Sequence, residues 1–179
     1  MRSGALPKFT VDFNEEDKIY LQMALGEAQK SFDDGNFPVG AALVIGGHLV
    51  GTARNLIKTN ANWVAHAEAE LIREHASLIK QSRKQGVDVT LYTSLESCLM
   101  CLGTAALNRI SRLVYSCPDP YTGATGIDPN SLNPGYAKMW PSIEQGPLKD
   151  ESKALVLASI ASTKQESRWA EMVALLKNV

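Results

Sequence analysis

The sequence has neither the long apolar run that a membrane-spanning segment needs nor the excess of basic residues typical of proteins that bind nucleic acid or anionic membranes. Its longest weakly polar stretch, FPVGAALVIGG at 37–47, is far shorter than the ~20 residues that cross a bilayer. Lys and Arg number 18 against 19 Asp and Glu, so no overall basic field favours nucleic acid or an anionic membrane. The first residues carry no apolar segment of the secretory type. We therefore expect a cytoplasmic protein with no membrane partner.

Cysteine is also scarce, with 3 in 179 residues. An odd number this small excludes a framework of disulfides and favours thiol or metal chemistry in a reducing compartment. Cys117 ends an apolar run and is typical of a buried thiol that packs as a small hydrophobe. Cys98 and Cys101 form C-x-x-C, a spacing that suits a redox dithiol as well as half of a zinc site.

The length predicts one domain over residues 1–179, with a core at about 13–162 and an amphipathic C-terminal helix at about 166–178. Apolar periodicity and turn signals predict a helix from Asn14 to Gly35, a hairpin around Gly46 and Gly47, and then alternating helices and strands. The helices are predicted at 65–81 and 98–109, and the strands at 87–94 and 112–117. A short strand at 141–145 and an ambiguous helix at 150–162 follow. The alternation indicates an α/β sandwich around one sheet.

Upstream of C-x-x-C, the segment HAE at 66–68 suggests a metal site. His66, Cys98 and Cys101 would supply three ligands and leave one tetrahedral position open, as in catalytic zinc sites. Residues two apart on a helix point about 200° away from each other. His66 and Glu68 can therefore approach one ion only if it lies beyond the first turn of their helix.

Ser97 immediately precedes Cys98, and serine is a favoured N-cap residue. We expect its side chain to cap the helix that carries the two cysteines. Two helix N-termini would then point at one metal, and their positive ends would favour the thiolate forms of the ligands.

The sequence resembles the zinc-dependent cytidine and deoxycytidylate deaminase superfamily, whose signature is H-x-E followed by P-C-x-x-C. HAE at 66–68 and SCLMC at 97–101 carry the resemblance, supported by PVGAALV at 38–44. DPYTGATG at 119–126 and SIEQGPL at 142–148 are similar to segments of bacterial tRNA adenosine deaminases. Within the superfamily, the chain looks most like these enzymes and the guanine deaminase-type nucleoside deaminases. The resemblance spans about 13–162 and departs at Ser97, where the signature has proline.

The resemblance implies a three-layer α/β sandwich with a central mixed five-stranded sheet and one Zn²⁺ per chain. It also implies hydrolytic removal of an exocyclic amine, with Glu68 moving protons between water, ring and leaving group. A homodimer is expected by the same analogy. Substrate contacts would come from the amide of Ala67, the main chain at Ser94 and Glu96, the side chain of Asn55, and an apolar slot at Phe37 and Val39.

The substrate has three interpretations. We expect a free nucleobase or nucleoside of the guanine or cytosine type, because the last fourteen residues hold only Arg168 and Lys177 as cations, whereas RNA affinity draws on phosphate contacts. A tRNA-specific adenosine deaminase is the alternative. A catalytically silent zinc scaffold is the third, although a scaffold would need no proton carrier such as Glu68.

Overall fold

The structure is a computed structural model that describes residues 13–163 and 166–179. Its elements, in chain order, are α1 (Phe13–Asp33), β1 (Gly40–Ile45), β2 (His48–Arg54), α2 (Ala67–Lys84), β3 (Val89–Leu95), α3 (Leu99–Leu107), β4 (Arg112–Cys117), a short 3-10 helix (Pro129–Ser131), α4 (Pro134–Ala137), β5 (Ser142–Gln145), α5 (Lys149–Ser162) and α6 (Glu166–Leu176). The ambiguous segment at 150–162 is therefore helical. α1 begins one residue before its predicted start at Asn14.

The five strands form one mixed sheet in the order β2-β1-β3-β4-β5. β1 pairs antiparallel with β2 and β3, whereas β3, β4 and β5 run parallel. The β1–β2 hairpin turns at Gly46 and Gly47, whose φ angles of 58° and 80° suit glycine. The carboxyl ends of β3 and β4 consequently lie side by side, where they lead into α3 and the 118–141 loop.

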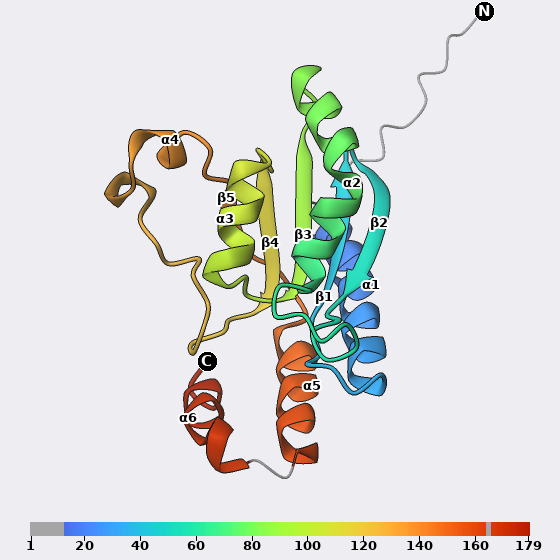
Figure 1. Cartoon of the computed structure of the whole chain (residues 1–179), viewed down its shortest axis with the longest axis vertical. Coiled ribbons are helices and arrows are strands. Elements are labelled where there is room, and N and C mark those ends of the chain that lie inside the picture. The colour runs from blue at the N-terminus through green and yellow to red at the C-terminus, as the bar shows by residue number, and fades with distance from the viewer. Residues whose placement is uncertain (1–12, 164–165) are drawn as a thin grey trace, which may run out of the picture.

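Helices cover both faces of the sheet (Figure 1). α2 and α3 lie over one face and bury Leu43, Leu91 and Leu113 in the largest apolar cluster. On the opposite face, α1 buries Ala42 and Val44 in a second cluster. Alternate residues of β1 thus face different helical layers, which explains why GAALVI is apolar throughout. The predicted α/β sandwich with a five-stranded mixed sheet is confirmed.

A third cluster lies at the carboxyl end of the parallel strands. Leu95 of β3 and Cys117 of β4 pack there against α5 and α6, with Met172 buried at the contact. Cys117 is buried in this cluster, 0% exposed, as expected for a packed thiol. The last helix is thereby brought to the end of the sheet that also carries α3 and the 118–141 loop. Within the described residues, no helix is both long and apolar enough to span a membrane.

Candidate active site

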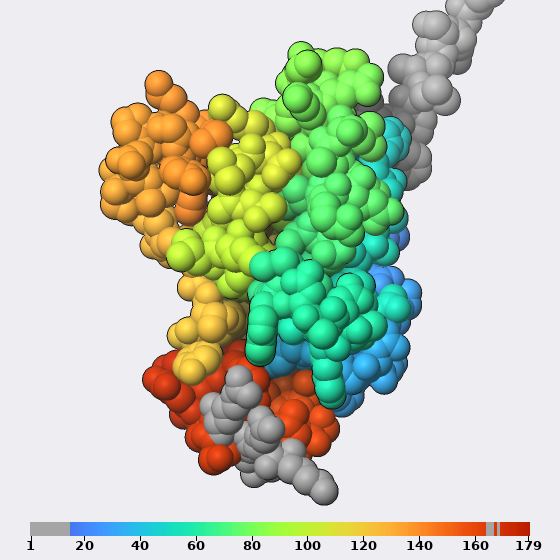
Figure 2. All heavy atoms as spheres, viewed as in Figure 1, coloured from blue at the N-terminus to red at the C-terminus, as the bar shows by residue number. Residues whose placement is uncertain are grey.

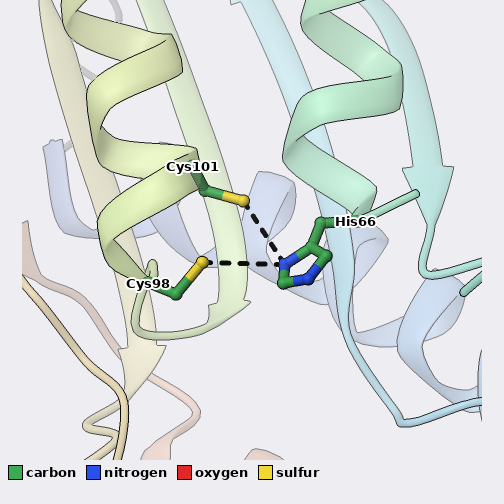
Figure 3. A group of neighbouring side chains, drawn as sticks. All are labelled: His66, Cys98 and Cys101. Carbon is green, nitrogen blue, oxygen red and sulfur yellow. Dashed lines mark hydrogen bonds between the residues drawn. The ribbon is translucent and has the colours of Figure 1, made fainter. Parts of the chain in front are cut away.

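Two helix N-termini bring the proposed metal ligands together. His66 is the N-cap residue of α2 and Cys98 is the N-cap residue of α3, both with extended backbone. Their side chains and that of Cys101 converge between the two helices (Figure 3). The metal site predicted beyond the first turn of α2 therefore has its side chains in place. The positive ends of both helices face it, which favours anionic ligands.

The distances within this cluster fit a zinc ion. Nδ1 of His66 lies 3.7 Å from Sγ of Cys98 and 3.5 Å from Sγ of Cys101. Zn–N and Zn–S bonds of the usual lengths in a tetrahedron put N and S about 3.6 Å apart. All three ligand atoms lie within 4.8 Å of one another. Three borderline-to-soft donors at these separations are suited to hold zinc with one position left for water or substrate.

The two thiols differ in acidity in the metal-free chain. The hydrogen bond with Cys101 lowers the pKa of Cys98 to about 4, despite the cost of burial, and His66 adds to the effect. The same hydrogen bond, together with burial, raises the pKa of Cys101. Cys98 is therefore the more acidic of the two thiols. Zinc binding would displace the thiol protons, because zinc binds the thiolate form of cysteine.

Glu68 lies beside this cluster on the first turn of α2 and is 2% exposed. Burial raises its pKa above that of an ordinary carboxyl, although its own backbone amide and the Ser97 hydroxyl oppose the shift. Its Oε1 accepts a hydrogen bond of 3.0 Å from Ser97 Oγ. Its Oε2 is buried and has no hydrogen-bond partner among the described residues. One oxygen of this carboxylate is thus held, and the other is available to a ligand.

The contact with Glu68 corrects the prediction for Ser97. The N-cap position of α3 belongs to Cys98, and no side chain caps that helix. Ser97 is fully buried, at 0% exposed, and its hydroxyl points across to α2 instead. The sequence preference for serine at helix starts was overridden by a buried carboxylate that needed a donor.

A pocket of about 740 Å³ opens next to the cluster, and His66, Glu68 and Cys98 line it. Its walls come from the loop at 55–65, the loop after β4, and the helices α5 and α6. These segments, teal, gold and red in Figure 2, meet on one face of the molecule. The pocket is large enough for a nucleoside and has one end at the proposed metal ligands.

Four of the six residues expected to contact substrate line this pocket: Phe37, Val39, Asn55 and Glu96. Ala67 and Ser94 do not line it, and both are fully buried. Ser94 is occupied within the fold, since its Oγ accepts from the amide of Gly40 and its carbonyl oxygen accepts from Ser152. The pocket thus departs from the sequence prediction at Ala67 and Ser94.

Two asparagine side chains stabilise the loop at 55–65, which forms one wall of the pocket. Oδ1 of Asn55 accepts from the amide of Ile57 at 2.9 Å, which makes a local turn. Oδ1 of Asn36 accepts from the amides of Lys58 and Thr59, and its Nδ2 donates to the Thr59 hydroxyl. Asn55 therefore stabilises a local turn and also lines the pocket.

Glu96 also has a structural task that the sequence did not reveal. Its carboxylate accepts hydrogen bonds from the amides of Asp119 and Thr125 and from the Thr125 hydroxyl. Asp119 in turn accepts from the amides of Tyr121 and Thr122. Glu96 thereby fixes the DPYTGAT loop as a wall of the pocket, and Asp119, Tyr121 and Thr122 line it.

Trp169 and Met172 of α6 also line the pocket, whereas the sequence predicted only an amphipathic helix there. Trp169 stacks on Phe37, with ring centroids 5.7 Å apart. No spacing rule joins residues this far apart in the chain. The one available signal was the apolar stripe of the last helix, which indicates burial without naming the surface it covers.

Comparisons with known proteins agree with this geometry. Residues 14–117 match the family model described as the cytidine and deoxycytidylate deaminase zinc-binding region. The chain is 32% identical to the tRNA-specific adenosine deaminase of Bacillus subtilis over 155 residues, which are 87% of this chain and 95% of the relative. The chain belongs to this zinc-dependent deaminase family. It is thus a zinc-binding enzyme, a hydrolase that acts on C–N bonds.

Other sequence relatives are named for tRNA and not for the free nucleobase or nucleoside expected from the sequence. The chain is 31% identical to the tRNA-specific adenosine deaminase of Aquifex aeolicus, over 77% of this chain and 90% of the relative. A solved structure from a study of A-to-I editing by tRNA:A34 deaminases superposes with a TM-score of 0.65, at 27% identity, covering 77% of this chain and 99% of the other. Guanine deaminase from Nitrosomonas europaea shares the fold, with a TM-score of 0.58 at 21% identity, over 88% of this chain and 94% of the other.

These findings overturn the expectation of a free nucleobase or nucleoside substrate. That expectation depended on the few cations in the last fourteen residues. The relatives from Bacillus subtilis and Aquifex aeolicus, at 32% and 31% identity, are named for tRNA and align along most of this chain. The charge of one terminal segment was therefore a poor guide, because phosphate contacts can come from any surface beside the pocket.

Proposed function

We propose that this deaminase converts an adenosine in a tRNA loop to inosine, with release of ammonia. The observation that supports it most strongly is the 32% identity to a tRNA-specific adenosine deaminase over 87% of the chain. The pocket of about 740 Å³ beside the proposed metal ligands has room for one nucleoside that has left its base stack. A nucleotide in a loop leaves its base stack at a lower cost than one in a duplex, which favours a loop adenosine as the substrate.

In this proposal, His66, Cys98 and Cys101 hold the zinc. Zinc bound there would act as a Lewis acid that activates the attacking water. Glu68 would take a proton from that water and give it to the ring nitrogen as the oxygen bonds to the ring carbon. It would then take the remaining proton from that oxygen and pass it to the amine as the carbon–nitrogen bond breaks. Water and adenosine thereby become inosine and ammonia, and Glu68 ends as it began.

The remaining contacts orient the base. Asn55 would offer hydrogen bonds to the ring from the loop wall, and Phe37 and Val39 would form an apolar slot beside it. Glu96 would act through the loop at 119–125 that it holds. Ala67 and Ser94, which do not line the pocket, have no substrate contact in this proposal.

A deamination assay on RNA tests the proposal. Zinc-loaded protein is incubated with an anticodon stem-loop that has adenosine at the first anticodon position, and inosine is measured after digestion to nucleosides. Inosine at that position, and none when guanosine replaces the adenosine, is the expected result. Ammonia from free guanine or cytidine with an untouched stem-loop would refute the proposal, as would silence on every substrate.

Two further properties belong to the same proposal. A homodimer would use the outer surface of α3, where Leu99 and Leu107 are 64% and 57% exposed. Light scattering at micromolar concentration should give twice the mass of the chain, and a monomer would contradict it. We also propose a cytoplasmic location, which fractionation tests.

A further inference from the structure

The hydroxyl of Ser97 makes a contact with the proposed proton carrier that the family signature does not provide for. The signature has proline before the first cysteine, and proline has no side-chain donor. Here Ser97 Oγ donates to Oε1 of Glu68 at 3.0 Å, and both residues are buried, at 0% and 2% exposed. The contact links the turn before α3 to the first turn of α2.

This hydrogen bond is the side-chain contact that orients the carboxylate of Glu68, which also interacts with its own backbone amide. The terminal torsion of a glutamate is broad, so packing alone sets it poorly. A serine hydroxyl has a single proton, which Ser97 gives to Oε1. Oε2 has no partner among the described residues, although it is buried, and Glu68 lines the pocket. The bond therefore leaves one defined oxygen to exchange protons.

Ser97 is itself held in place from the other side. Its carbonyl oxygen accepts from the amide of Ala124 at 3.0 Å. The next residue, Cys98, forms an isolated β-bridge with Gly123. The Ser97 hydroxyl therefore lies on a segment that is hydrogen-bonded to the loop at 119–126. Glu96 stabilises the same loop. A fixed donor can orient a carboxylate, whereas a mobile one would follow it.

We propose that Ser97 is a positioning residue for the deamination, which holds Oε1 of Glu68 so that Oε2 faces the reacting groups. The inference rests on the proposed role of Glu68 as proton carrier. Ser97 itself touches neither substrate nor metal in this proposal. Its effect should appear in the rate of the chemical step, with substrate binding and zinc content preserved.

Ser97→Ala and Ser97→Thr test the proposal, with Ser116→Ala as the matched control. Ser116 is also fully buried, but its hydroxyl has no partner among the described residues and lies outside the pocket lining. We expect Ser97→Ala to lower kcat per bound zinc by about 10- to 100-fold, the usual cost of a misplaced catalytic group. KM should stay unchanged, and Ser97→Thr, which keeps the hydroxyl, should recover most of the rate.

Zinc content and melting temperature separate this effect from a structural one. Wild-type kcat per zinc in Ser97→Ala would overturn the inference, and so would a loss of activity that merely follows lost zinc. Ser116→Ala losing the same activity as Ser97→Ala would overturn it as well, because any buried hydroxyl would then suffice.

Glu68→Ala is measured in parallel to keep the two proposals apart. An active Glu68→Ala refutes the role of Glu68, whereas an inactive one beside a fully active Ser97→Ala refutes only the role of Ser97. Crystals of zinc-loaded wild type and Ser97→Ala provide a readout that needs no substrate. A turned Glu68 carboxylate in the variant supports the inference, and an unchanged one overturns it even if the stem-loop proves to be the wrong substrate.

Discussion

The indole of Trp169 stacks on the ring of Phe37, with centroids 5.7 Å apart and planes inclined by 18°. Phe37 precedes β1 and Trp169 belongs to α6, and both line the pocket. The stacked pair connects α6 to the pocket wall formed by the segment before β1. The last helix is consequently part of the site.

Trp169→Ala should loosen α6. The ring is half-buried, so its loss should cost about 2 kcal/mol of local stability, less than for a fully buried tryptophan. We expect faster amide exchange across α6 and earlier proteolytic cleavage there, measured by mass spectrometry. Glu171→Ala, on the exposed side of the same helix, should leave both unchanged. Equal exchange in the two variants would show that the stack does not hold the helix.

Cys101→Ser should abolish zinc binding, since it removes one of the three clustered ligand atoms. Metal content by mass spectrometry should fall from one zinc per chain to nearly none. Cys117→Ser changes a cysteine buried elsewhere in the fold and should keep the metal. Full zinc occupancy in Cys101→Ser would remove this residue from the ligand set.

Glu68→Ala should separate metal binding from turnover. The three ligands remain, so zinc content should equal that of wild type, whereas kcat should fall by about 10²- to 10⁴-fold with the loss of the proton carrier. Single-turnover kinetics on the stem-loop measures the chemical step directly. Loss of zinc together with activity would indicate instead that Glu68 supports the metal site.

Gly123→Ala should disturb the pocket wall, whereas Gly126→Ala should not. A Cβ at Gly123 would collide with the carbonyl of Asp119 and the carboxylate of Glu96, but one at Gly126 meets no atom within 4 Å. Overpacking of this kind costs about 1–3 kcal/mol. We expect a raised KM and a lower melting temperature for Gly123→Ala alone. Two variants that behave alike would argue against the rigid loop.

Asp17→Asn should change how stability depends on pH. Asp17 accepts hydrogen bonds from Arg112 at 2.7 and 2.8 Å and from the Tyr92 hydroxyl at 2.9 Å. Burial raises its pKa, but these bonds outweigh burial and hold the pKa below its ordinary value of 3.8. A carboxyl whose pKa is lower in the folded state than in the unfolded state stabilises the fold. This stability is fully present above the unfolded-state pKa and is lost as the pH falls through the folded-state pKa.

The variant should therefore be less stable than wild type by about 2–3 kcal/mol at pH 7, with the gap closing below about pH 4. Urea unfolding at pH 7 and at pH 3 measures this difference in stability. Asp88→Asn is the control, because its side chain is 85% exposed. A gap that is the same at pH 3 and pH 7 would contradict the linkage.

Much of the architecture was predictable from local patterns. Gly46-Gly47 placed the hairpin, since few other residues adopt positive φ at two successive positions. The continuous apolar run of β1 indicated a strand covered on both faces. The strand order and the parallel pairing of β4 with β5 were not predictable in this way, because a four-residue edge strand has too little pattern to specify its neighbour.

The sequence by itself determined the chemistry: H-x-E and C-x-x-C place His66, Cys98 and Cys101 at helix starts, and helix geometry then permits one shared ion. Tertiary structure alone decided how the groups around that ion are used. Ser97 turns to Glu68, 29 positions away, Glu96 holds the loop at 119–125, and Trp169 closes the wall at Phe37. Such choices depend on which buried polar and apolar groups meet after folding, and no local spacing encodes that.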